Sequence, residues 1–87
     1  MQIVYLIQNS HDKSIYIGKT SNLTKRLQQH NFNENNSTKR LRGRWILIYA
    51  EAYKDKKDAN IREKRLKAHG SGKYELYKRL ESSLLKK

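Results

Sequence analysis

The stretch that decides the fold is IVYLIQNSHDKSIYIG, which spans residues 3–18. Residues 3–7 form a continuous apolar run of β-branched and aromatic side chains, as expected of a strand that is buried on both faces. Residues 8–13 are rich in turn-forming types, and residues 14–18 again have strand character. Two short strands joined by a turn predict an antiparallel hairpin.

The segment after the hairpin predicts a helix, a loop and a third strand. Thr20 or Ser21 can cap a helix that carries apolar side chains at Leu23 and Leu27 and runs to about residue 31. Residues 31–38 are too polar to pack in a core and predict a long loop. Residues 45–52 are apolar throughout, so we expect a strand at the centre of the sheet.

The remaining residues predict two more helices. The second helix can begin at Asp55 or Asp58 and end at Gly70, and a third can begin at Gly72. The third helix carries its apolar side chains on one side, at Tyr77, Leu80 and Leu84. The expected order is ββαβαα, an α+β fold in which helices flank a small, mostly antiparallel three-stranded sheet. At 87 residues, we expect one domain over residues 1–87.

The composition excludes several classes of protein. The chain has no cysteine, which excludes disulfides, thiolate metal sites and a cysteine nucleophile. Its longest apolar runs are far shorter than the roughly 20 residues of a membrane span, and no signal-peptide pattern follows the N-terminus. We therefore expect a soluble cytoplasmic protein without a membrane partner.

The charge indicates a polyanionic partner. Lys and Arg number 20 against 8 Asp and Glu, a formal net charge of +12. Lys and Arg side chains that neutralise phosphates release counterions, so nucleic acid is the leading candidate. Residues 1–36 carry only +2 of the excess, so most of it lies in the C-terminal part. A tight basic run precedes the third strand, at Lys39, Arg40, Arg42 and Arg44.

Charged side chains occupy apolar positions on both of the first two helices. Arg26 and His30 share the helical stripe of Leu23 and Leu27. On the second helix Glu63 falls on the face that should meet the sheet, and it is the only one of the eight acids that we expect to point inward. Two alternatives remain open here: Glu63 and Arg26 form a structural ion pair, and His30 is a structural histidine near a helix end.

The hairpin carries two tyrosines that can lie near each other across the strands. Tyr5 and Tyr16 have cross-strand packing as their ordinary interpretation. Gly18 follows Tyr16 on the same strand face, and a missing side chain in a strand often marks the close approach of a ligand. Lys19 comes next and can lower the pKa of a neighbouring phenol. Such a phenol could act as a general base or orient a water.

These residues, taken in order, resemble the GIY-YIG nuclease family. The resemblance rests on Val4-Tyr5-Leu6, then Tyr16-Ile17-Gly18 ten residues later, then Arg26 and His30 on a helix. The segment from Ala59 to Leu66, with Arg-Glu-Lys at residues 62–64, is similar to the Glu-bearing helix of that family. Ile3 stands where the family motif opens with Gly, and residues 61–87 lack the Asn that several family nucleases have in the last helix.

The resemblance implies a metal-dependent DNA endonuclease that hydrolyses phosphodiester bonds with Mg²⁺ or Mn²⁺. Carried over by position, Glu63 would bind the metal and Arg26 would hold the scissile phosphate. Tyr5 and Tyr16 would position or deprotonate the attacking water, and His30 would assist. Lys19 and the basic run would contact DNA. We expect structure-directed or weakly sequence-specific cutting by a monomer, with no nucleotide cofactor.

Two other functions remain open. One is a non-catalytic nucleic-acid-binding module that keeps the nuclease fold, with Phe32, Trp45 or an exposed tyrosine stacking on bases. The other is a basic RNA- or ribosome-associated protein, which needs only the charge. The placement of the tyrosines, Arg26 and Glu63 favours the nuclease.

Overall fold

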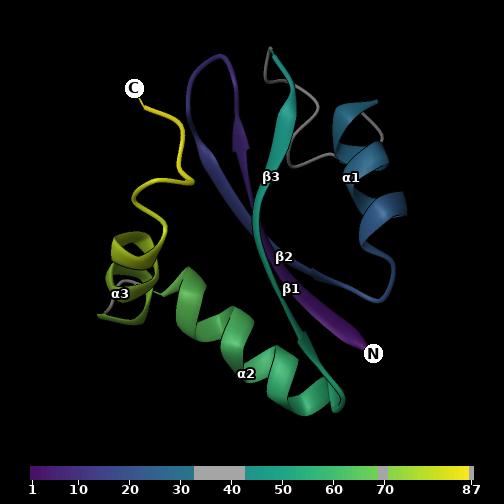
Figure 1. Ribbon diagram of the computed structural model, residues 1–87. Coiled ribbons are helices and arrows are strands. Elements are labelled where there is room, and N and C mark those ends of the chain that lie inside the picture. Colours follow the sequence, from purple (N-terminus) through teal and green to yellow (C-terminus); the bar gives the residue numbers. More distant parts are fainter. Residues whose placement is uncertain (33–42, 69–70, 87) are drawn as a thin grey trace.

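The computed structural model describes residues 1–32, 43–68 and 71–86. Its elements follow the expected order ββαβαα, which confirms the predicted α+β fold (Figure 1). They are β1 (Gln2–Asn9), β2 (Ile15–Thr20), α1 (Leu23–Asn31), β3 (Trp45–Tyr53), α2 (Lys56–Lys67) and α3 (Ser71–Arg79). No helix in the described part of the chain is long and apolar enough to cross a membrane.

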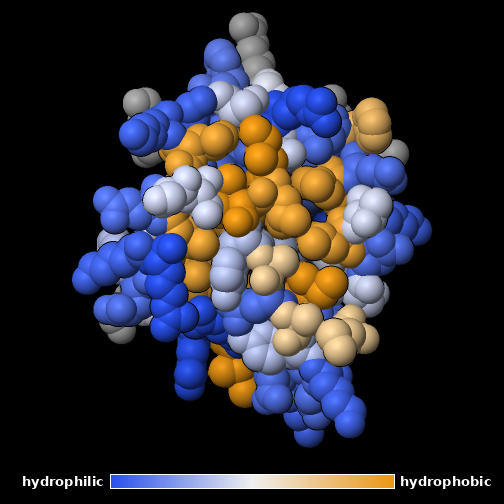
Figure 2. Space-filling model, in the orientation of Figure 1, coloured by the Kyte–Doolittle hydropathy of each residue, from blue (hydrophilic) through white to orange (hydrophobic). Residues whose placement is uncertain are grey.

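The sheet has the strand order β2-β1-β3, and both pairings are antiparallel. The expected hairpin is confirmed as β1 and β2, with Tyr5 opposite Gly18 and Ile7 opposite Tyr16. The expectation of a central third strand is wrong, because β1 lies between the other two and β3 forms an edge. Ile46 and Leu47 of β3 each keep 39% of their surface exposed. In Figure 2, which has the orientation of Figure 1, apolar side chains are exposed near the middle of the view, and hydrophilic side chains surround them.

The helices cover both faces of the sheet, with α1 on one face and α2 and α3 on the other (Figure 1). Successive side chains of a strand point to opposite faces, so β1 contributes to two cores. Val4 and Leu6 pack with Leu66 and Leu76 beneath α2 and α3. Tyr5 and Ile7 face α1 instead, with Trp45 and the partly buried Leu23, Leu27 and Tyr16.

The helix ends follow capping chemistry, with small shifts from the predicted bounds. Asn22, rather than Thr20 or Ser21, caps α1, because its side chain accepts a hydrogen bond from the Lys25 backbone N–H at 3.1 Å. Asp55 caps α2 in the same way through the N–H of Lys57 at 2.7 Å. Ala68 is the C-cap of α2, and the predicted end at Gly70 lies outside the described residues.

The third helix is shorter than predicted. It begins at Ser71, one residue before the expected Gly72, and it ends at Arg79. Leu80 and Leu84 therefore follow the helix, yet both pack against the core beneath α2 and α3.

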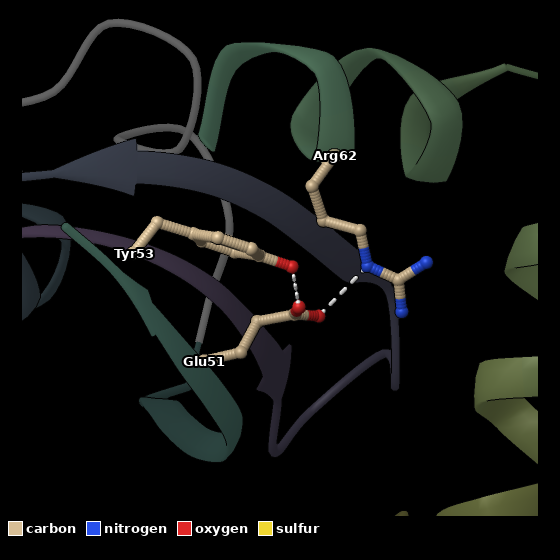
Figure 3. A network of polar contacts seen from close by, with 3 residues as sticks. All are labelled: Glu51, Tyr53 and Arg62. Atoms are coloured by element: carbon tan, nitrogen blue, oxygen red, sulfur yellow. Dashed lines mark hydrogen bonds and ion pairs between the residues drawn. The ribbon is translucent and has the colours of Figure 1, made fainter. Parts of the chain in front are cut away.

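A second acid points inward besides Glu63. The Glu51 side chain is 17% exposed and binds Arg62 of α2, whose Nε lies 2.9 Å from Glu51 Oε1. The Tyr53 hydroxyl donates to the other carboxylate oxygen, so Glu51 lies between the two partners (Figure 3). Burial, the hydrogen bond and the charge of Glu51 raise the pKa of Tyr53 to about 12. The expectation that seven acids lie on the solvated surface is therefore wrong for Glu51, which ties α2 to β3.

Candidate active site

The β1–β2 hairpin packs two tyrosine rings against each other over a glycine. The ring centroids of Tyr5 and Tyr16 are 6.3 Å apart. A Cβ atom added to Gly18 would lie 2.4 Å from the Tyr5 hydroxyl oxygen and 3.0 Å from a ring carbon of Tyr16. The expectation that Gly18 makes room for a ligand is therefore wrong, because the Tyr5 phenol fills this space. Gly18 is needed so that both rings can lie on one face of the hairpin.

His30 in the last turn of α1 completes this aromatic cluster. Its Nε2 lies 2.9 Å from the Tyr5 hydroxyl, and its ring meets that of Tyr16 edge-on at 4.8 Å between centroids. Trp45 closes the cluster, with its ring 6.3 Å from His30 and 6.4 Å from Tyr16. Sequence reasoning missed this role of Trp45 and considered it only as a stacking residue. The cluster brings together three of the five predicted catalytic residues.

Asn31 fixes the end of α1 against the start of β3. Its side chain accepts a hydrogen bond from the Trp45 N–H at 2.7 Å and donates one to the Trp45 carbonyl at 3.1 Å. This pair of bonds sets where His30, the preceding residue, meets the hairpin. The sequence gives no local signal for it, because the two residues are 14 positions apart.

Burial keeps both partners of the Tyr5–His30 hydrogen bond in their neutral forms. Tyr5 is 2% exposed and His30 is 1% exposed. Burial, with a smaller effect of the Arg26 guanidinium, lowers the pKa of His30, so the imidazole is neutral at pH 7. Burial, aided by the Tyr16 phenol, raises the pKa of Tyr5 well above its usual range. The Tyr5–His30 hydrogen bond therefore joins a protonated phenol to a neutral imidazole.

Arg26 and Glu63 bring opposite charges to the cluster from different helices. Both side chains are half-buried, Arg26 on α1 and Glu63 on α2. The Arg26 guanidinium lowers the pKa of the Tyr5 phenol, whereas the Glu63 carboxylate raises it, so both charges act on the same hydroxyl. The described residues form two salt bridges, Glu51–Arg62 and Glu63–Lys67. The alternative of an Arg26–Glu63 ion pair is therefore wrong.

Comparison with known proteins identifies the family of the chain. The family model described as the GIY-YIG catalytic domain matches residues 1–84. The chain belongs to the GIY-YIG family. Members of this family are generally nucleases that use divalent metal ions. The predicted resemblance is thereby confirmed for almost the whole chain.

Two relatives extend the comparison. This GIY-YIG chain is 37% identical over 67 residues to the UPF0213 protein CPE1444 of Clostridium perfringens, which covers 77% of this chain and 71% of the relative. It also resembles the solution NMR structure of the UPF0213 protein BH0048 from Bacillus halodurans, with a TM-score of 0.56 and 27% identity. That match covers 93% of this chain and 86% of the other, and it supports the fold described above.

The donor chemistry of this GIY-YIG site fits a divalent ion held by one carboxylate. The described residues contain no group of three or more His, Asp or Glu side chains that could surround a metal. Mg²⁺ often binds through one or two carboxylates and keeps several waters. Glu63 supplies such a carboxylate, and the ammonium of Lys67 lies 3.2 Å from its Oε2. A cation can therefore be accommodated at this oxygen.

The predicted DNA-contacting cations of the GIY-YIG chain have different surroundings. The half-buried Lys19 is bonded to the Asn60 side chain of α2. Arg44 is exposed, and its backbone N–H donates to the Ser10 hydroxyl at 3.0 Å. Lys39, Arg40 and Arg42 lie outside the described residues. Lys67, which the sequence reasoning did not single out, lies instead at the candidate site.

The buried neutral His30 predicts a pH-dependent stability. The folded-state pKa of His30 lies below the ordinary value of 6.5. As the pH falls, the unfolded chain therefore binds a proton at this imidazole before the native state does. We expect the free energy of unfolding to fall as the pH drops below about 6.5, by at most about 1.4 kcal/mol per pH unit. Urea titrations between pH 5 and 8 measure this slope.

Two variants test whether His30 causes this pH dependence of the free energy of unfolding. His30→Gln should flatten the dependence between about pH 5 and 6.5. His11→Asn removes an exposed imidazole and should leave the slope as in the wild type. If His30→Gln keeps the full slope, the imidazole does not titrate as its burial requires.

Proposed function

We propose that this protein is a DNA endonuclease that hydrolyses phosphodiester bonds with Mg²⁺ or Mn²⁺. The observation that carries the proposal is the convergence of Arg26 and Glu63, of opposite charge, on the Tyr5 phenol and its partners His30 and Tyr16. A cluster with only a structural role requires the aromatic rings. It does not require two half-buried side chains of opposite charge, Arg26 and Glu63, that form no salt bridge with each other. Membership of a family of nucleases supports the same function.

In the proposed mechanism the partly exposed groups contact the substrate. The planar guanidinium of Arg26 can donate two parallel hydrogen bonds to oxygens of the scissile phosphate. Tyr16 is the half-buried phenol, and it orients the attacking water. A divalent ion bound at Glu63 would supply the positive charge that stabilises the phosphate as negative charge develops.

The buried groups have a supporting role in this mechanism. Tyr5 keeps its proton at neutral pH, because the pKa of its phenol is raised far above its usual range. We propose that it positions His30, whose ring edge in turn fixes the Tyr16 ring. Deprotonation of water by Tyr5 is not part of this mechanism, because only 2% of the residue is exposed.

A nicking assay tests the proposal against the alternative of a pure binding module. Supercoiled plasmid, linear duplex, single strands, flaps and branched DNA are incubated with Mg²⁺, with Mn²⁺ and with EDTA. We expect nicking with either metal, none with EDTA, and a preference for DNA structure over sequence. Binding without cleavage under all conditions would favour the non-catalytic module.

The salt dependence of binding tests the basic run. Each phosphate that a cation neutralises on duplex DNA contributes about 0.9 to the slope of log affinity against log salt. We propose that Arg40, Arg42 and Arg44 contact DNA, so their joint replacement by Gln should weaken binding and lower the slope by about 2 to 3. Fluorescence anisotropy over a salt series measures it, and an unchanged slope would show that these residues face away from DNA.

A further inference from the structure

Lys67 connects two side chains of the candidate site. It lies in the last turn of α2, one turn after Glu63, and its Nζ is 3.2 Å from Glu63 Oε2. The same Nζ lies 5.9 Å from the centroid of the Tyr16 ring, within range of a cation–π contact. The ammonium thus holds a positive charge between the proposed metal ligand and the proposed water-orienting phenol.

This ammonium and a divalent ion compete for the same carboxylate. The Glu63 side chain is 21% exposed. Its negative charge is therefore partly removed from water, and a nearby cation stabilises it. The Lys67 side chain is 50% exposed, and an ion pair one turn apart on a helix is weak, so the ammonium can leave towards solvent. A divalent ion on the same oxygen would repel Lys67 at close range.

We propose that Lys67 is the internal cation of this site: it holds the Glu63 carboxylate beside Tyr16 and is displaced when a divalent ion binds. The inference rests on the proposed function, because it takes Glu63 as the metal ligand. Lys67 is then a positioning residue that weakens resting metal affinity. Removal of its charge should tighten divalent-ion binding about threefold to tenfold, from the lost ion pair and the lost repulsion.

Direct binding of Mn²⁺ to the full chain without DNA tests the inference. Electron paramagnetic resonance of free Mn²⁺ gives the dissociation constant for the wild type, Lys67→Met, Lys67→Arg and Lys64→Met. Lys64 is an exposed residue of the same helix, so Lys64→Met removes the same formal charge away from the carboxylate. We expect tighter binding in Lys67→Met, whereas Lys67→Arg and Lys64→Met should stay within about twofold of the wild type.

A Glu63→Gln variant tests the proposed metal ligand separately from the proposed role of Lys67. If Glu63→Gln loses Mn²⁺ binding and Lys67→Met tightens it, both the metal ligand and the internal cation are supported. If Glu63→Gln loses binding but Lys67→Met matches the wild type or Lys64→Met, the internal cation is overturned and the metal ligand stands. If Glu63→Gln binds Mn²⁺ like the wild type, the proposed metal ligand fails and the inference fails with it.

Discussion

Glu63→Gln is expected to lower the rate of metal-dependent nicking by at least about a thousandfold while duplex affinity stays within about twofold. Glutamine keeps the shape of the side chain and its place on α2, but it removes the single charge that the candidate site offers to a divalent ion. Loss of a bound metal removes several kcal/mol of charge stabilisation, and about 4 kcal/mol corresponds to a thousandfold in rate.

Glu51→Gln is the matched control for this prediction. Glu51 is also a half-buried carboxylate paired with a cation on α2, but its partners are Arg62 and Tyr53 (Figure 3). Its replacement should lower the free energy of unfolding by about 1–3 kcal/mol and leave the nicking rate of folded protein within a few-fold. Nicking by Glu63→Gln at the wild-type rate, or an equal loss in both variants, would contradict the assignment of the metal to Glu63.

Local patterns predicted most of the fold, and the errors lie where distant segments meet. The β1–β2 hairpin was predictable because both strands and their turn lie within residues 2–20. The apolar pattern of residues 45–52 resembles that of a central strand, but strand order depends on pairing between distant segments. The exposed Ile46 and Leu47 show that an apolar strand need not be covered on both faces.

Helical periodicity correctly predicted that His30 faces the sheet, but it did not predict the partner of Glu63. The spacing of Arg26 and His30 predicted that both face the sheet, and His30 does meet both tyrosines there. Glu63 pairs with Lys67 rather than Arg26, because a lysine one turn away competes successfully for its carboxylate. The catalytic roles themselves remain predictions that the proposed assays address.

Alternation along β3 could have revealed the inward position of Glu51. Tyr49 and Tyr53 flank it at two-residue spacing, and both pack against the core beneath α2 and α3. A carboxylate between two core-facing aromatic residues of a strand shares their face. The partner Arg62 could not be predicted in this way, since the approach of α2 to β3 is set by packing over the whole sheet.

The second large effect is expected from Gly18→Ala, which should lower the free energy of unfolding by about 1–3 kcal/mol. The added methyl group would lie 2.4 Å from the Tyr5 hydroxyl oxygen and 2.6 Å from the adjoining ring carbon. The Tyr5 side chain cannot move aside easily, because it is 2% exposed and bonded to His30. Nicking should fall together with stability, since a displaced Tyr5 releases the imidazole that fixes Tyr16.

Gly72→Ala provides the control for the loss of a glycine. Gly72 lies in α3, where the nearest atom to an added Cβ is the Arg65 carbonyl oxygen at 4.0 Å. Alanine is more favourable in a helix than glycine, so this variant should be as stable as the wild type or more stable by up to about 1 kcal/mol.

Urea unfolding of Gly18→Ala, of Gly72→Ala, and of Gly18→Ala combined with Tyr5→Phe measures the cost of the clash. Tyr5→Phe removes the hydroxyl oxygen nearest the methyl group and should recover part of the loss. A Gly18→Ala variant as stable as Gly72→Ala would mean that the hairpin has room above Gly18, and the Tyr5 phenol would then not fill the space that this glycine leaves.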